Sequence, residues 1–129
     1  MTDVPVEHLM STDLVTIAPG AAAADAASRM LETGVSSLLV VDDGGRLAGL
    51  ITATDFVSLV RRNDPEDETP VEAFMTTDVV TVSPDDSVEE LAAPTDRGYT
   101  HLPVVNADNQ LVGMVSATDL TTYLSEHRR

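Results

Sequence analysis

The 129-residue chain contains no cysteine, no tryptophan and no lysine, and only two phenylalanines and two tyrosines. The lack of cysteine excludes disulfides, thiolate zinc sites and cysteine nucleophiles. Because aromatic residues are so few, the core must be built mainly from valine, leucine, alanine and methionine. No apolar run approaches the roughly 20 residues of a membrane span, and the first residues lack the basic start and apolar stretch of a signal peptide. We expect a cytoplasmic protein that makes no membrane contact.

Positive charge is also scarce. All seven basic residues are arginines, and 22 acidic residues bring the formal net charge to −15. Binding of nucleic acid through a basic face needs clustered lysine and arginine, so this class is excluded. Such a charge repels itself in dilute buffer, whereas molar salt shortens the Debye length to about 3 Å. The composition looks like that of an extreme halophile's protein, which predicts that stability rises with potassium chloride; an ordinary acidic protein is the alternative.

The chain contains an internal repeat. The segment VEHLMSTDLVT at 6–16 matches VEAFMTTDVVT at 71–81, and GLITATD at 49–55 matches GMVSATD at 113–119. The offset is 65 residues for the first pair and 64 for the second, so one residue has been lost from the second copy between them. A repeat of this length indicates one supersecondary unit that is used twice.

We interpret the chain as two repeats, in residues 1–62 and 71–129, joined by an acidic linker at 63–70 that contains two prolines. Each repeat has the pattern of a β-α-β-β-α unit. In the first repeat the pattern predicts an extended stretch at 15–17, a helix at 21–32, strands at 37–41 and 46–52 around a turn at 42–45, and a helix at 54–61. Gly34 is expected to end the first helix.

One repeat of about 55 residues buries too little apolar surface to fold alone. We therefore expect an α+β fold in which the two repeats pack sheet to sheet about a pseudo-twofold axis, with clefts where the copies meet. Pro94 breaks the pattern, because it falls inside the first predicted helix of the second repeat. Proline removes a backbone donor and clashes with the preceding turn, so this helix should end near Ala93 and the segment 94–98 should take another path.

The first repeated block, V-E-x-x-M-[ST]-T-D-[LV]-V-T-[IV]-x-P, resembles the beginning of a CBS domain. The second block, G-[LM]-[IV]-[ST]-A-T-D, and the segment HLPVVN at 101–106 are similar to later parts of the same family. The resemblance covers nearly the whole chain, with two copies in register. It implies a stand-alone tandem CBS pair, or Bateman module, whose clefts in many members hold AMP, ADP, ATP or S-adenosylmethionine. It also implies a regulatory sensor that commonly forms homodimers.

The resemblance assigns ligand contacts first to Thr52 and Asp55 and to their counterparts Ser116 and Asp119. In the family this Asp accepts hydrogen bonds from ribose hydroxyls, while the hydroxyl residue and the helix start face the phosphate. A helix start offers unpaired N–H groups, and a carboxylate can accept from two adjacent hydroxyls. Helix capping is the alternative, because TATD and SATD both have the Ser/Thr-x-x-acid spacing of a capping box, which needs no ligand.

Further contacts are implied in the extended stretch and near the second strand of each repeat. These residues are Thr16, Ile17, Thr81 and Val82 against an adenine base, and Ser37, Tyr99, His101 and Pro103 around the ligand site. His101 stands where family members often hold a basic residue, so it could approach a phosphate, and Arg97 is another such candidate. A buried strand edge and an exposed histidine are the alternative interpretations.

The sequence shows no catalytic constellation. The three histidines lack metal-ligand spacing, and neither a glycine-rich phosphate loop nor a nucleophile elbow is present. We predict no enzyme activity and no obligatory cofactor, but a sensor of an adenosine-containing compound that modulates a partner protein or its own dimerisation. The negative field favours AMP, ADP or cationic S-adenosylmethionine over ATP. A ligand-independent interaction module is the alternative, favoured by Pro94 and the few basic residues.

Overall fold

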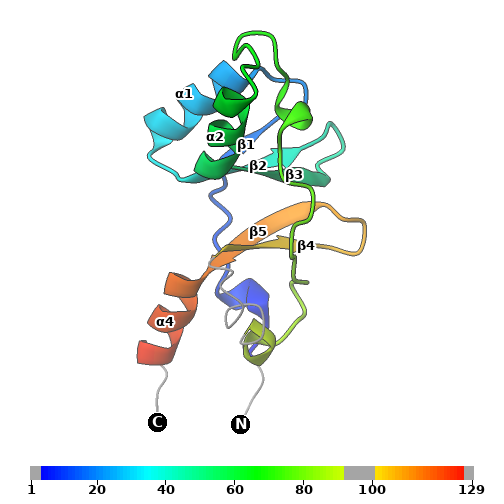
Figure 1. Ribbon diagram of the computed structural model, residues 1–129. Helices are drawn as coiled ribbons and strands as arrows, with labels where there is room; N and C mark the ends of the chain where they lie inside the picture. Colours follow the sequence, from blue (N-terminus) through cyan, green and yellow to red (C-terminus); the bar gives the residue numbers. More distant parts are fainter. Residues whose placement is uncertain (1–3, 92–100, 127–129) are drawn as a thin grey trace. The chain divides into compact units, whose positions relative to one another are not determined.

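The computed structural model describes residues 4–91 and 101–126 of the chain. Within these ranges it has three α-helices, three short 3-10 helices and two small sheets, which confirms the predicted α+β class (Figure 1). The chain divides into two compact units. Residues 15–79 form the first-repeat unit, and residues 1–14 together with 80–129 form the second-repeat unit. The sheet-to-sheet packing of the two repeats stays a prediction.

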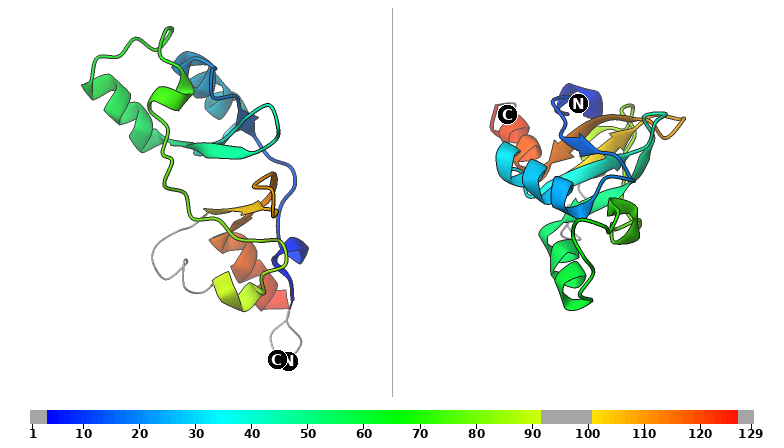
Figure 2. Two further views of the ribbon diagram at one scale, coloured as in Figure 1. Left: turned by 90° about the vertical axis from the view of Figure 1, so that its right-hand side faces the viewer. Right: turned by 90° about the horizontal axis from the view of Figure 1, so that it is seen from above.

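The first-repeat unit follows the predicted order of elements. These are β1 (Thr16–Ile17), α1 (Ala23–Thr33), β2 (Ser37–Val41), β3 (Leu47–Thr52), α2 (Ala53–Arg61) and the 3-10 helix η2 (Val71–Ala73). The sheet has the order β1-β2-β3, with β1 parallel to β2 and β3 antiparallel to it. Helices α1 and α2 cover the same face of this sheet (Figures 1 and 2). Gly34 ends α1 in the left-handed region at φ 71°, as predicted.

The second-repeat unit departs from the predicted order in its first half. Its elements are η1 (Val6–His8), η3 (Val88–Leu91), β4 (His101–Val105), β5 (Leu111–Ser116) and α4 (Ala117–Glu126). The counterpart of β1 is reduced to one parallel bridge between Val82 and Val104. Within the described residues, the 3-10 helix η3 stands where the sequence predicts the first helix of this repeat. Pro94 and the predicted detour at 94–98 lie outside the described residues.

The stretch that precedes the first strand of each repeat pairs with the sheet of the other repeat. We call residues 6–14 and 71–79 the leading segments. The pairs exchange two backbone hydrogen bonds each: Thr76 with Leu50 of β3 (2.9 and 2.8 Å), and Ser11 with Met114 of β5 (2.8 and 3.0 Å). Both leading segments also supply core residues, Val6 to one unit and Val71 to the other. The compact units therefore cross the boundaries of the sequence repeats.

Where each leading segment crosses the adjacent strand, that strand has a glycine. A Cβ on Gly49 would stand 2.7 Å from Met75 Sδ and 2.8 Å from the Thr76 carbonyl oxygen, and a Cβ on Gly113 would stand 2.5 Å from Met10 Sδ. Real Cβ atoms essentially never approach so closely. Only glycine therefore lets the leading segments lie against β3 and β5 at these distances.

Each unit has its own apolar core, and matched positions fill both. The first-repeat core groups Leu38, Val40, Ile51, Leu59 and Phe74, and the second-repeat core groups Val6, Leu91, Leu102, Val104 and Val115. Leu38 and Leu102 are 0% and 3% exposed, and they are matched in the repeat. The side chains of β2 at 38–40 are all buried, as the continuous apolar run predicts. Packing of these cores holds both strand pairs in position, and the candidate site residues lie at the ends of those strands.

Candidate ligand-binding site

Strand register brings three of the predicted site residues together in the first-repeat unit. Ser37 pairs with Thr52 where β2 begins and β3 ends. Helix α2 starts at the next residue and carries Asp55 in its first turn. The three polar side chains therefore converge at one end of the strand pair, although Ser37 and Asp55 are far apart in sequence.

The second-repeat unit repeats this geometry. His101 pairs with Ser116 where β4 begins and β5 ends, and α4 follows with Asp119 in its first turn. Pro103, the next but one residue along β4, accepts a hydrogen bond from the Val82 backbone N–H (3.0 Å). Val82, a predicted adenine contact, thus pairs with the strand that carries His101, a predicted phosphate contact. Tyr99 and Arg97 lie outside the described residues.

Both aspartates cap the helices that carry them, which confirms the capping alternative. The carboxylate of Asp119 accepts from the Ser116 N–H (2.8 Å), and the Ser116 hydroxyl accepts from the Asp119 N–H (3.0 Å). Asp55 Oδ2 accepts from both the N–H (2.9 Å) and the hydroxyl (3.2 Å) of Thr52. Capping and ligand contact are compatible, because a carboxylate has about four acceptor positions.

Asp55 makes one more hydrogen bond than Asp119. The Thr76 hydroxyl, from the leading segment, donates to Asp55 Oδ1 (3.0 Å). Ser11 is the counterpart of Thr76 in the repeat, yet Asp119 Oδ1 has no hydrogen-bond partner among the described residues. The sequence pattern could not reveal this contact, because it joins residues 21 positions apart.

The predicted adenine contacts also differ between the units. Ile17 and Val82 are both buried, at 5% and 8% exposure, which confirms the buried strand edge. The carbonyl of Thr16 accepts a hydrogen bond from the Arg29 guanidinium of α1. The carbonyl of Thr81 accepts none within the described part of the chain, and Thr81 is the more exposed of the two threonines. Sequence reasoning missed Arg29.

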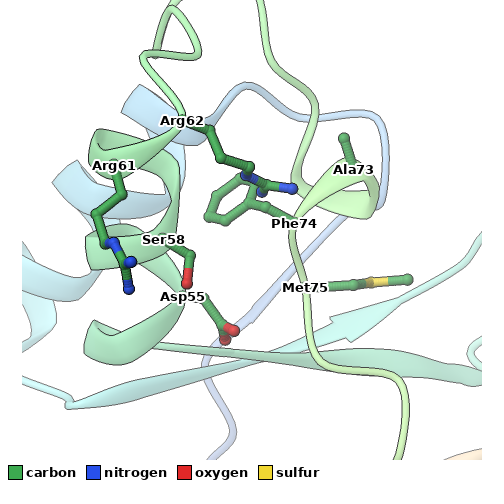
Figure 3. Close-up of a pocket in the computed structure, with 7 residues that line it drawn as sticks. All are labelled: Asp55, Ser58, Arg61, Arg62, Ala73, Phe74 and Met75. Carbon is green, nitrogen blue, oxygen red and sulfur yellow. The ribbon is translucent and has the colours of Figure 1, made fainter.

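A pocket of about 520 Å³ opens between α2 and the leading segment at 71–79 (Figure 3). Asp55, Ser58 and Arg61 line it from α2, Arg62 lines it from the next residue in the chain, and Ala73, Phe74 and Met75 line it from the other side. Arg62 also forms an ion pair with Asp64 at 3.4 Å. The spacing 55, 58 and 61/62 would have placed these groups on one helix face, a signal that the sequence analysis did not use.

Residues of both extended stretches line pockets that do not contain Asp55. A pocket of about 420 Å³ contains Ile17 together with Arg29 and Glu32, and one of about 510 Å³ contains Thr81, Val82 and the acidic pair Asp85–Asp86. Asp86 accepts from the Ser83 N–H (2.9 Å), so it acts as a local cap. In the first repeat, Asp55 and Ile17 therefore line separate pockets.

Two other features are absent from the described residues. Residues 4–91 and 101–126 contain no group of three or more histidine, aspartate or glutamate side chains placed to hold a metal ion. No helix within those same ranges is long and apolar enough to span a membrane.

Residues 6–62 and 71–126 each match the CBS domain family. An uncharacterised 17.7 kDa protein of Acidianus ambivalens is 34% identical over 120 residues, which cover 92% of this chain and 72% of that protein. Homoserine O-acetyltransferase of Methanohalobium evestigatum is 31% identical over 123 residues, covering 94% of this chain. That match spans only 24% of the enzyme, so the chain corresponds to about a quarter of it.

Solved structures give the same fold. The structure of CBSX2 in complex with AMP has a TM-score of 0.84 at 23% identity and covers 97% of this chain and 98% of that one. The CBS domain pair of protein MJ0100, in complex with 5′-methylthioadenosine and S-adenosylmethionine, has a TM-score of 0.79 at 24% identity, with 97% and 98% covered. Two family matches and these folds agree with the repeat in the sequence: the chain belongs to the CBS domain family, as a tandem pair of CBS domains.

Proposed function

We propose that this chain is a regulatory module that binds an adenosine-containing compound and alters a partner protein, or its own dimerisation, when it does so. The observation that carries the proposal is the repeated cluster at the strand ends. In each unit a hydroxyl residue and an aspartate at a helix start stand beside the first residue of a paired strand. A carboxylate next to a helix start suits a ligand that has adjacent hydroxyls and a polar 5′ group.

The related structures support this ligand class. CBSX2 binds AMP, and the MJ0100 pair binds 5′-methylthioadenosine and S-adenosylmethionine. These compounds share adenosine and differ in the charge at the 5′ position. We therefore propose that adenosine is the part of the ligand that this chain recognises. The surrounding negative charge favours AMP, ADP or S-adenosylmethionine over ATP.

We propose no catalytic role. The match to homoserine O-acetyltransferase concerns only the quarter of that enzyme that resembles this chain. Outside the two helix starts, the acidic residues of the described ranges cap turns, lie in exposed segments or, in the case of Asp64, pair with Arg62. A binding module therefore accounts for the arrangement without a reaction.

Isothermal titration in multimolar potassium chloride tests the function, with AMP, ADP, ATP and S-adenosylmethionine titrated separately. We expect saturable binding of at least one compound, and its loss in the double variant Asp55→Asn/Asp119→Asn. The matched control is Asp43→Asn/Asp67→Asn, which makes the same charge change at two exposed positions. Absence of binding by all four compounds to the folded protein would exclude the proposed function.

The acidic composition supports a second proposal, that the protein works in the cytoplasm of a cell with high internal salt. The two units carry eleven acidic residues each, against four arginines in residues 15–79 and three in the remainder. The acidic residues repel one another, and salt screens this repulsion. The melting temperature should therefore rise steeply between low and molar potassium chloride. Circular dichroism during heating measures this, and a melting temperature indifferent to salt would contradict it.

A ligand-independent module is the alternative function, and one surface favours it. Val57 and Val60 of α2 are 58% and 72% exposed, whereas the counterpart of Val57 in α4 is Thr121. We propose a second copy as the partner, because pairing of two α2 helices would bury these exposed valines against each other. Sedimentation should show a dimer that Val57→Lys weakens and Thr121→Lys does not; an unchanged dimer in Val57→Lys would exclude this surface.

A further inference from the structure

We infer that the two candidate ligand sites are not equivalent: Thr76 and Arg29 occupy acceptor groups of the first-repeat site, whereas the matching groups of the second-repeat site are available to a ligand within the described residues. The inference rests on the proposed function and adds to it which repeat binds. The two sites lie at matched positions of the internal repeat, so each can be compared with the other residue by residue.

The first step concerns the carboxylates. A carboxylate has about four acceptor positions, and a ribose diol that donates both hydroxyls needs two of them. Asp55 already accepts three hydrogen bonds, two from Thr52 and one from Thr76. Asp119 accepts one, from the Ser116 N–H. Asp119 therefore keeps room for a diol while it caps α4, whereas Asp55 does not.

The difference comes from the leading segments. Both cross the adjacent strand with the same pair of backbone hydrogen bonds, so Thr76 and Ser11 occupy equivalent places. The Thr76 hydroxyl reaches Asp55 Oδ1, while in the described residues the Ser11 hydroxyl makes no such contact with Asp119. The γ-methyl group of threonine restricts its rotamers, which helps to hold the hydroxyl in place.

The second step concerns the other end of each site and is independent of the first. The Arg29 guanidinium donates to the Thr16 carbonyl and lines the pocket beside Ile17. With either offset of the repeat, the counterpart of Arg29 is Ala93 or Pro94, and neither side chain can donate a hydrogen bond. The Thr81 carbonyl is accordingly unengaged within the described ranges, and Thr81 is exposed. In the first-repeat site, the Asp55 carboxylate and the Thr16 carbonyl are thus both hydrogen-bonded to other side chains of the chain.

Titration at high salt tests the inference through stoichiometry, with AMP and S-adenosylmethionine as separate probes. The intact chain should bind one molecule per chain, and Asp119→Asn should weaken that binding by about tenfold to a hundredfold, because hydrogen bonds to a charged group are lost. The double variant Arg29→Ala/Thr76→Ala should raise the stoichiometry to two. Ser11→Ala is the matched control and should leave one molecule bound at unchanged affinity.

The outcomes separate the inference from the proposed function. Two molecules bound to the intact chain, or binding that survives unchanged in Asp119→Asn, would overturn the asymmetry and leave the sensor intact. A stoichiometry that stays at one in Arg29→Ala/Thr76→Ala, with the variant folded by circular dichroism, would show that these side chains do not close the site. No binding of either probe to the intact chain would remove the proposed function for these ligands, and the inference with it.

Discussion

The two units were built from one sequence pattern, and they differ in the contacts that the pattern does not specify. In each, a strand pair ends beside a helix start, and a glycine lets a leading segment cross the sheet. In the first-repeat unit the leading segment also reaches Asp55, and α1 supplies Arg29 to Thr16. Duplicated segments thus keep their local structure, while side chains that reach between segments are free to diverge.

The largest expected effects come from the cores, where the units should behave alike. Leu38→Ala and Leu102→Ala each remove a buried side chain at matched positions, so each should lower the free energy of unfolding by about 2–5 kcal/mol. Denaturant titration at high salt measures the loss. Leu31→Ala, at 85% exposure, is the control and should change little. A small effect at only one of the matched positions would show that the cores are not equivalent.

The crossing glycines should distinguish the units. Gly49→Ala would press a Cβ against the carbonyl of Thr76, whose backbone makes two hydrogen bonds with Leu50, whereas the three atoms nearest to a Cβ at Gly113 all belong to the flexible side chain of Met10. Overpacking of this kind costs about 1–3 kcal/mol. We expect Gly49→Ala near the upper end and Gly113→Ala near the lower, measured as shifts of the unfolding midpoint. Equal losses, or a larger loss for Gly113→Ala, would contradict the geometry of the two crossings.

The smallest predicted difference lies at the capping aspartates. Asp55→Ala and Asp119→Ala both remove a cap, at about 1 kcal/mol each. Asp55→Ala also breaks the contact with Thr76, which should add about another 1 kcal/mol. A double-mutant cycle between Asp55 and Thr76 should therefore show coupling, and the matched cycle between Asp119 and Ser11 should show none. Coupling of the same size in both cycles would mean that Ser11 contacts Asp119 in solution.

Much of the fold could be predicted, because it depends on short segments. The strand at 37–41 was predicted with the bounds that it has in the structure, and α1 begins and ends within two residues of the prediction. Continuous apolar runs and Gly34 carried these predictions. The 3-10 turn η3 was not foreseen, because a run such as Val88–Leu91 has the residues of a helix.

The candidate site could be predicted only in part. The aspartates and their hydroxyl partners were found because a capping box leaves a pattern within four residues. Arg61 and Arg62 were missed although their spacing from Asp55 along α2 could have indicated them. Arg29 and Thr76 were missed because each contacts a residue of another segment. No periodicity or local motif encodes such contacts.

The sequence by itself determined the repeat, the family, the order of strands and helices in the first repeat, and the caps at both helix starts. These depend on hydrogen bonding and apolar alternation among near neighbours in the chain. Only the tertiary structure decided that each leading segment joins the sheet of the other repeat, and that Thr76 and Arg29 occupy groups which the second repeat leaves open. The physical reason is that these contacts join separate segments, whose meeting depends on how the cores pack.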